Sequence, residues 1–573
     1  MSAARPASVA GPTTGAIERA GLVLSAMGVL SLFTVRGYIE NSPATAPDIT
    51  YGAAAFLLLT VLSTLRRAPR WAAPFALAMV AFGYLYANAI LDGTEIGTAF
   101  LIVALFLGYR FAPPEWRALV IGGFSLWTPA LTLYSGARPL RVEPPVAVAA
   151  VAALGLFVLE IFRGTRDGED RLRRVGVGIA AIAMTAAVFE RHNIVSSSIL
   201  APDDITAICA VAVLVVLTLW RRSWTRISTV AAILALTVYA FVCLANVLGK
   251  GYNNDAVVAP HWGATLLLQG KDPYASFDMR DGLAYFRLEP NLATHREDGS
   301  VQTTLNYPAG AILVVAPFIA AGLTDIRWVY FAEVMIFGAL MVARARLPWR
   351  PYVASLFVAD TLLRRQYVLA GIDPTWALGT AFAFLLWRRS ILSPLALGLG
   401  AACRQLAWFF APFYLVAAYR EFGAREAMRR AATIAVGFVV PNLPFIVWDP
   451  ASWWRGMMGP ILDPLAGYGI GLVHFEIEGV IPDLPRGLYA VLAAAAFLFL
   501  LALVWRRWRD LPNGALAFPL LPIFFAWRSL SNYFVFVPLF GILRDPDLME
   551  EVADEVTVTE RGTLELARRA QAT

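Results

Sequence analysis

Long apolar runs separated by short polar segments make up most of the chain from residue 20 to residue 543. As helices, runs of about 15 to 22 residues are long enough, or nearly so, to cross a hydrocarbon core of about 30 Å. The pattern predicts an all-α polytopic membrane protein with about 17 to 19 membrane segments. The predicted helices up to residue 249 span 20–35, 49–65, 71–91, 94–110, 117–134, 145–162, 174–190, 204–220 and 227–249.

Composition agrees with this pattern, because 58% of the 573 residues are hydrophobic and only 15% are charged. A soluble globular protein carries about 25% charged residues. The net charge is +6, but the positive residues gather in short loops between apolar runs, as helix-end anchors do. The basicity therefore indicates membrane topology, and no nucleic-acid partner is expected.

Arginine clusters predict which loops are cytoplasmic, since translocation of positive charge is costly. They follow every second predicted helix, which places both termini in the cytoplasm and residues 250–306 outside a multi-pass cytoplasmic membrane. The clusters lie at 66–70, 110–117, 163–174, 221–226, 343–350, 385–389, 419–430 and 506–510.

This alternation of cytoplasmic and external loops holds only if the proline-interrupted apolar segment 304–323 does not fully cross the membrane. We expect a re-entrant or juxtamembrane element there, because such a backbone is tolerated where protein buries it. The alternative is an ordinary crossing helix with one misassigned neighbour.

Four parts follow from the pattern. Residues 1–226 form N-terminal membrane helices without an assigned role, and 227–448 form a module that carries the first external loop, 250–306. Residues 449–543 contain a second external loop, 449–487, and the C-terminal membrane helices. Residues 544–573 form a cytoplasmic tail.

The first external loop contains NDAVVAPHWGATLLLQGKDPY, residues 254–274. It resembles the first external loop of the C-type (GT-C) integral membrane glycosyltransferases, especially the bacterial polyprenyl-phosphate-mannose-dependent mannosyltransferase-like branch. In that branch an Asp just past a membrane helix precedes a short helix and a G-x-D/N-P-Y turn. The matching residues here are Asp255, Gly270, Asp272, Pro273 and Tyr274.

Later segments resemble further landmarks of the branch in the same order. A tyrosine-proline-proline element has its counterpart at 306–309, Asn-Tyr-Pro-Ala, with one proline replaced. GIDPTWAL (371–378) occupies the place of a glycine-polar turn in the branch. AACRQLAWFFAPFYL (401–415) occupies the place of a lysine-containing helix break. WRSLSNYFVFVPLF (527–540) occupies the place of a late polar-tyrosine motif. The resemblance covers about 250–543 and does not reach the helices before residue 227.

The resemblance implies transfer of a sugar, such as mannose, from a polyprenyl-phosphate donor to a lipid, glycan or protein acceptor at the external face. Asp255 is the expected general base, which implies inversion at the anomeric carbon. The departing phosphate needs positive charge or oriented donors. Arg404 and Arg528 lead as its ligands, followed by Lys271 and His261. Tyr274, Tyr307 and Asn532 complete the expected substrate-binding set.

Each of these residues also has a structural explanation. Asp255 could cap the following helix, and Asp272 before Pro273 favours a turn. Arg404 and Arg528 interrupt apolar runs, where a functional role and a buried ion pair compete.

No cofactor is expected, with one alternative kept open. In HFEIE a strand-like alternation would put Glu476 and Glu478 on one face beside His474, which would suit a divalent metal.

Two other function classes remain. One is a transporter or lipid flippase, in which Arg404 and Arg528 would line a pathway. The other is a non-catalytic scaffold related to the glycosyltransferases. In the main hypothesis the partners are the lipid-linked donor, membrane lipids and the acceptor.

Overall fold

The computed structural model of the chain describes residues 13–39, 47–90, 95–126, 144–162, 168–192, 202–220, 223–249, 251–359, 363, 371, 373–511 and 513–550. This part of the chain is mostly helical, as the apolar pattern predicts. The predicted helix 117–134 is described only as far as residue 126, and Lys250 lies outside the described residues.

The helices before the first polar segment follow the predicted order closely. They are α1 (Thr14–Ile39), α2 (Pro47–Thr64), α3 (Ala72–Ile90), α4 (Glu95–Phe111), η1 (Pro114–Trp116), α5 (Arg117–Ser125), α7 (Pro144–Phe162), α8 (Gly168–His192), α9 (Pro202–Leu219) and α10 (Trp224–Gly249).

The middle of the chain alternates short and long helices. They are α11 (Asp255–Leu268), α12 (Pro273–Ser276), α13 (Met279–Tyr285), η2 (Pro290–Leu292), α14 (Gly310–Ala320), α15 (Arg327–Arg344), η3 (Leu347–Trp349), α16 (Arg350–Ala359), α18 (Asp373–Leu385), α19 (Leu392–Cys403), η4 (Gln405–Phe409), α20 (Phe410–Phe422) and α21 (Ala424–Trp448).

The last part combines helices with a minimal parallel sheet. Its elements are α22 (Pro450–Leu462), β1 (Tyr468–Gly469), α23 (Leu472–Ile477), α24 (Arg486–Arg506), α25 (Gly514–Ala517), η5 (Leu521–Phe525), β2 (Arg528–Ser529), η6 (Ser531–Tyr533) and α26 (Val537–Ile542). In the sheet, Tyr468 pairs with Arg528 and Gly469 with Ser529.

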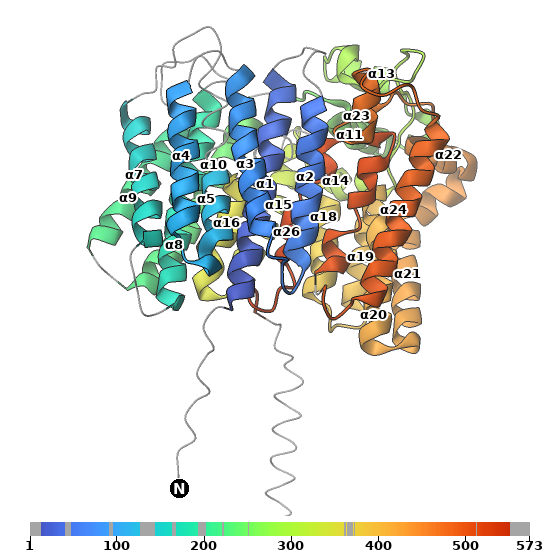
Figure 1. Ribbon diagram of the computed structural model, residues 1–573. Coiled ribbons are helices and arrows are strands. Elements are labelled where there is room, and N and C mark those ends of the chain that lie inside the picture. Colours follow the sequence, from blue (N-terminus) through green and yellow to red (C-terminus); the bar gives the residue numbers. More distant parts are fainter. Residues whose placement is uncertain are drawn as a thin grey trace, which may run out of the picture.

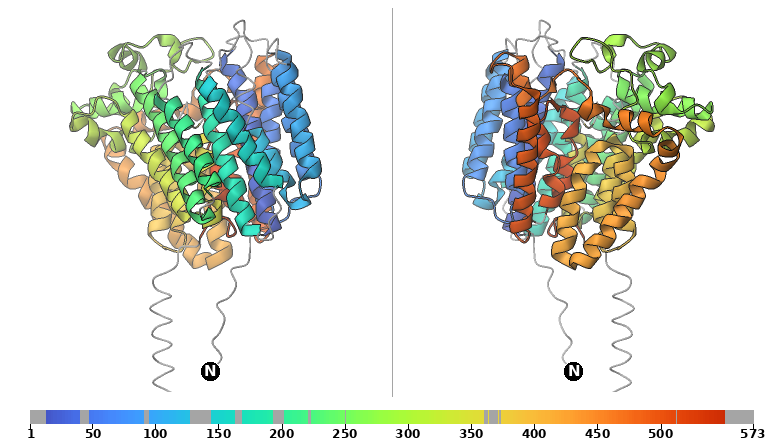
Figure 2. Two further views of the ribbon diagram at one scale, coloured as in Figure 1. Left: turned by 90° about the vertical axis from the view of Figure 1, so that its left-hand side faces the viewer. Right: turned by 90° about the vertical axis from the view of Figure 1, so that its right-hand side faces the viewer.

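Most long helices run side by side, and the short helices α13 and α23 lie at one end of this bundle (Figure 1). We call that end the loop end, because it carries α11, α13 and α23. The opposite end, where α1 begins, is the terminal end. Side views show the green residues of the first polar segment above the bundle at the loop end (Figure 2).

Several arginine-bearing loops predicted to be cytoplasmic meet at the terminal end. The Arg66 N–H donates to the Asp510 carbonyl at 3.1 Å, and the Arg346 N–H donates to the Leu548 carbonyl at 2.9 Å. A bridge between Ala345 and Met549 continues the second contact. The loops around residues 66, 346 and 510 and the segment 544–550 therefore lie on one side of the bundle.

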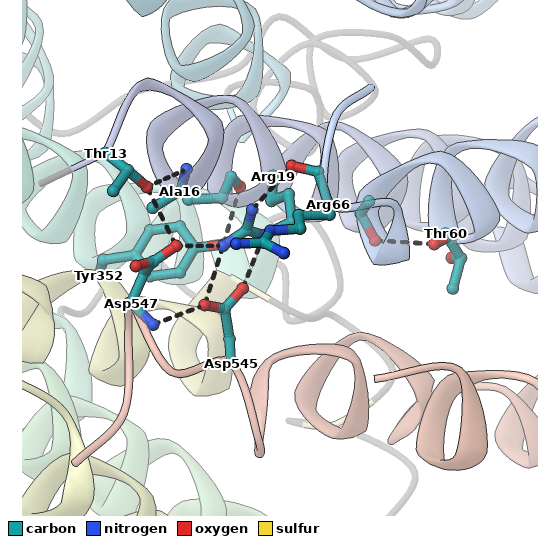
Figure 3. Close-up of polar contacts among 10 residues, drawn as sticks. Thr13, Ala16, Arg19, Thr60, Arg66, Tyr352, Asp545 and Asp547 are labelled. Carbon is teal, nitrogen blue, oxygen red and sulfur yellow. Dashed lines mark hydrogen bonds and ion pairs between the residues drawn. The ribbon is translucent and has the colours of Figure 1, made fainter. Parts of the chain in front are cut away.

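A buried ion pair joins the two ends of the described chain (Figure 3). Arg19 of α1 is 5% exposed, and its Nε lies 2.7 Å from Oδ2 of Asp545. Its Nη2 donates to Asp547 at 2.8 Å, and the Thr13 hydroxyl also donates to Asp547, at 3.0 Å. We call this group the Arg19 clasp.

Apolar side chains form two cores. The larger one extends from Ala16 in α1 to Met549, so the N-terminal helices and the C-terminal segment share it. The smaller one lies beneath the loop end and joins Val257 of α11, Leu305, Tyr330 of α15 and Phe445 of α21. The start of α11 therefore rests on a packed apolar base.

Three described helices are long and apolar enough to cross a membrane by length and composition, namely α10, α21 and α24. Their 21 to 26 residues give lengths of about 32 to 39 Å at 1.5 Å per residue. On α24 the apolar side chains of Leu498 and Phe499 are 63% and 66% exposed, as expected of a lipid-facing surface. The structure thus indicates a helical, membrane-associated protein.

The segment predicted as re-entrant or juxtamembrane contains α14, which has 11 residues. At 1.5 Å per residue it is about 16 Å long, about half of a hydrocarbon core. It packs against α11 and α19. A Cβ on Gly310, its first residue, would lie 2.5 Å from the Ala402 carbonyl oxygen, so glycine permits this close approach.

Candidate functional site

The candidate site begins at the first turn of α11. Asn254 precedes the helix in an extended conformation, and its side-chain oxygen accepts from the N–H groups of Ala256 and Val257. Asn254 is therefore the N-cap, and the idea that Asp255 serves as the cap is wrong. The Asp255 carboxylate instead accepts from the Thr294 N–H, with a distance of 2.6 Å to Oδ2.

A second carboxylate lies close to the same turn. Gly371 has a positive φ of +113° and approaches Ala256 so closely that a Cβ would lie 2.6 Å from the Ala256 carbonyl oxygen. Two residues later Asp373 begins α18 and is 1% exposed. Its Oδ1 accepts from Nε1 of Trp376 at 2.9 Å, and its Oδ2 accepts from Nδ2 of Asn532 at 3.0 Å.

Arg404 completes this buried group. It follows the end of α19 with an extended backbone, φ −154° and ψ 142°, so the predicted helix break is present. Its Nη1 lies 2.8 Å from Oδ1 of Asp373. The guanidinium also lies 5.5 Å from the ring centre of Tyr307 and 5.7 Å from that of Tyr533, both within cation–π range.

The tyrosine-proline element is held by hydrogen bonds from three directions. The Tyr274 hydroxyl donates to the Tyr307 carbonyl at 2.8 Å, and Nε2 of Gln405 donates to the Asn306 carbonyl at 3.0 Å. The Ala309 N–H donates to Oδ1 of the buried Asn442 at 2.9 Å. Tyr307 is therefore fixed by backbone contacts, and its ring is free to contact Arg404.

Burial raises the pKa of the Tyr307 phenol above its ordinary value, and Arg404 opposes that rise. Asp255 and Asp373 both act in the raising direction as negative charges. Tyr307 thus lies among all three ionisable side chains, and its hydroxyl stays neutral and able to donate a hydrogen bond.

Three distant segments join at the peptide that holds Asp255; we call residues 294–302, 464–470 and 527–529 the roof. The Ala466 N–H donates to the His295 carbonyl at 3.0 Å, and the Glu297 N–H donates to the Pro464 carbonyl at 2.8 Å. Nη1 of Arg528 donates to the Ala466 carbonyl at 2.8 Å. Ala466 therefore lies between Arg528 and the peptide next to Thr294, which holds Asp255.

Arg528 and Arg404 differ in charge compensation. Arg404 is paired with Asp373, whereas no carboxylate of the described residues lies within ion-pair distance of the half-buried Arg528. Arg528 is therefore the better-suited residue for an incoming anion.

The structure does not bring every predicted residue to this group. Lys271 is exposed at the end of the turn that follows α11. The Tyr274 side chain supports Tyr307 from within the smaller core, and Asp272 caps α12 by accepting from the Tyr274 N–H, as the turn interpretation predicts. Asn532 contacts Asp373. Within the described part of the chain, neither Lys271 nor Tyr274 contacts Asp373 or Arg404, so no contact of this kind supports a substrate-binding role for them.

His261, the last of the candidate phosphate ligands, is buried. It is 5% exposed, its Nδ1 shares a hydrogen bond of 2.8 Å with the Tyr252 hydroxyl, and its ring centre lies 4.7 Å from that of Phe286. Desolvation lowers the pKa of His261 from its ordinary value to about 4. At neutral pH it is uncharged and offers no positive charge to a phosphate.

The expected strand-like alternation of HFEIE is wrong. His474 and Glu476 belong to α23, and Glu478 caps its C-terminal end. Residues two apart on a helix point in different directions, so the two carboxylates do not share a face. Glu476 instead accepts from the Leu484 N–H at 3.0 Å and from the Tyr489 hydroxyl. Within the described ranges, no three His, Cys, Asp or Glu side chains are placed to hold a metal ion.

Sequence reasoning missed Asp373, Tyr533 and the contact from Thr294. Asp373 was part of a recognised segment, but Asp followed by Pro is common in turns, and its partners Arg404 and Asn532 lie 31 and 159 residues away. The only local signal was an acidic residue at the edge of an apolar run.

Comparison with known proteins adds no identification: no family model, no curated protein and no solved structure matches this chain. The chemistry must therefore be argued from the site itself. That site offers one carboxylate held by a peptide N–H, a neutral tyrosine, a compensated arginine and an uncompensated arginine.

Proposed function

We propose that the chain is a multi-pass glycosyltransferase of the cytoplasmic membrane, of GT-C type. It transfers a sugar, such as mannose, from a polyprenyl-phosphate donor to a lipid, glycan or protein acceptor at the external face. In this proposal both termini lie in the cytoplasm, the chain has the 17 to 19 membrane segments predicted from the sequence, and the reaction uses no cofactor.

One observation carries the proposal. The segments around residues 255, 307, 373, 404 and 532, which resemble the glycosyltransferase landmarks, converge on one group at the loop end, although up to 277 residues separate them. The buried tyrosine and two arginines provide donors for a phosphate. Five polar or ionisable residues gathered in one place beside apolar helices favour a functional task over packing alone.

In this reaction the acceptor hydroxyl attacks the anomeric carbon and gives its proton to Asp255. The bond from that carbon to the phosphate oxygen breaks, and its electron pair leaves with the phosphate. Attack from the face opposite the phosphate inverts the configuration. The Thr294 N–H fixes one carboxylate oxygen, which leaves the other for the acceptor.

The test compares Asp255→Asn with the wild type in purified full-length protein, using radiolabelled polyprenyl-phosphate sugars and a lipid-extract acceptor pool. Asparagine keeps an oxygen for the Thr294 N–H but cannot take a proton at neutral pH. We expect turnover to fall by about 100-fold or more, because general base catalysis typically contributes 10² to 10⁴.

Asp298→Asn is the matched control, since Asp298 lies in the same loop and, among the described residues, its side chain accepts hydrogen bonds from Ser300 in its own turn. It should turn over normally. Equal turnover by Asp255→Asn and Asp298→Asn would overturn the assignment of Asp255 as general base. Lipid transport in vesicles without product from any donor would favour the flippase alternative.

A further inference from the structure

Asp373 has no task in the transfer reaction, yet it is the most densely bonded carboxylate of the site. Its partners come from three separate elements: Trp376 of α18 and Asn532 of η6 donate hydrogen bonds to it, and Arg404 at the α19–η4 break forms an ion pair with it. A carboxylate that is 1% exposed needs such partners, because burial of an unpaired charge is costly.

The position of Arg404 depends on this carboxylate. Arg404 lies at a break between helices, so the helix backbone does not dictate where its side chain points. The rings of Tyr307 and Tyr533 contact the guanidinium, but ring faces tolerate sliding, whereas the 2.8 Å contact with Oδ1 of Asp373 fixes one edge.

Charge compensation matters because the phosphate changes charge during transfer. The lipid-linked donor is a phosphodiester with one negative charge. The product is a phosphomonoester, which carries about 1.5 to 2 negative charges at pH 7. Two uncompensated arginines would bind the product more tightly than the donor and would slow its release.

We propose that Asp373 is a positioning residue for phosphate recognition: it fixes the Arg404 guanidinium and offsets its charge, so that the site releases the lipid phosphate product. This role rests on the proposed function. In it, Arg528 supplies the net positive charge and Arg404 supplies oriented hydrogen-bond donors.

Asp373→Asn separates charge from geometry. The asparagine oxygen can still accept from Trp376 and still faces Arg404, and its amide takes the place of the oxygen that faces Asn532. The variant therefore removes one negative charge and keeps the size of the side chain and the hydrogen bond from Trp376. Asp373→Ala removes the charge, the side-chain volume and these contacts.

The measurement is binding of polyprenyl phosphate, with the uncharged polyprenol as reference, to purified full-length protein, together with kcat and KM. For Asp373→Asn we expect about tenfold tighter polyprenyl phosphate binding, a lower KM for the donor and a lower kcat, because product release becomes slow. Asp373→Ala should lose kcat without the gain in affinity, since Arg404 loses the carboxylate that fixes its Nη1.

Asp545→Asn is the matched control. Asp545 is also 1% exposed and paired with an arginine, but it lies at the terminal end. It should lower thermal stability and leave phosphate affinity unchanged.

The outcomes separate the two proposals. A wild type that prefers polyprenyl phosphate over polyprenol, with Asp373→Asn unchanged or weaker, would overturn the role of Asp373 alone. The same affinity gain in Asp545→Asn would also overturn it. A wild type without that preference would overturn the lipid-phosphate donor and this role with it. If Asp255→Asn does not lower turnover, only the assignment of Asp255 as general base is overturned.

Discussion

Asn254 and Asp255 show how adjacent polar residues at one helix start take different tasks. A helix leaves its first N–H groups without intrahelical partners, and the Asn254 side chain satisfies two of them. The Asp255 carboxylate is thereby released from capping and lies against the Thr294 N–H. The same arrangement adds the favourable field of the helix N-terminus to a carboxylate in the first turn.

His261 gives a prediction about pH at the residue scale. Its pKa is about 4 in the folded protein and about 6.5 in an unfolded chain. Unfolding therefore takes up a proton between these values, so the free energy of unfolding falls as pH falls from about 6.5 to about 4. Below about pH 4 both states are protonated, and this contribution no longer changes.

The measurement is the midpoint of thermal unfolding of the purified protein between pH 7 and pH 4. His261→Asn removes the titrating group and should flatten this part of the profile. His295→Asn removes a histidine from the same polar segment and should keep the wild-type slope. Identical slopes in all three proteins would contradict the assignment.

At the scale of elements, close backbone contact between α14 and α19 yields a second prediction. Gly310→Ala places a Cβ 2.5 Å from the Ala402 carbonyl oxygen, so one helix must shift. We expect a loss of about 1 to 3 kcal/mol in the free energy of unfolding, as for other overpacked sites, and reduced turnover because Arg404 follows α19 directly.

Gly541→Ala is the control for this helix pair, because a Cβ on Gly541 in α26 would meet no atom within 4 Å. It should be neutral or slightly stabilising, since alanine favours helices. Both variants are compared by thermal unfolding. Equal stability would show that α14 and α19 can separate without cost.

The sequence predicted helices well and distant contacts poorly, for physical reasons. Apolar runs such as 71–91 correspond to α3 within one residue at each end, because hydrophobic length determines such helices. The short motif HFEIE was misassigned, since alternation over a few residues does not separate strand from helix. The partners of Asp373 depend on how α18, α19 and η6 pack together, and no local pattern records that packing.

For the whole molecule, the separation of loop end and terminal end predicts membrane sidedness. In a background without the three native cysteines, Ser276→Cys tests the exposed part of the first polar segment and Arg67→Cys tests an exposed residue at the terminal end. A membrane-impermeant maleimide should label residue 276 in intact cells and residue 67 only after permeabilisation. The reverse pattern would place the candidate site in the cytoplasm.

The N-terminal helices support a site that they do not form, through hydrogen bonds from α2. Thr50 of α2 donates to the Gly471 carbonyl at 3.3 Å, and the Gly471 N–H donates to the Ser529 hydroxyl at 2.8 Å. Ser529 adjoins Arg528 in β2. The helix α2 thus braces the roof segment that carries the uncompensated arginine.

The Arg19 clasp has a consequence for biosynthesis. Arg19 is made early, but its partner Asp545 lies 526 residues later. At about 5 to 20 residues per second, α1 waits roughly half a minute to two minutes with an unpaired guanidinium, and the large core cannot close before the last described residues emerge. The helix α1 can pack against α2 and α5 while synthesis continues, but its buried ion pair closes only with the last described residues.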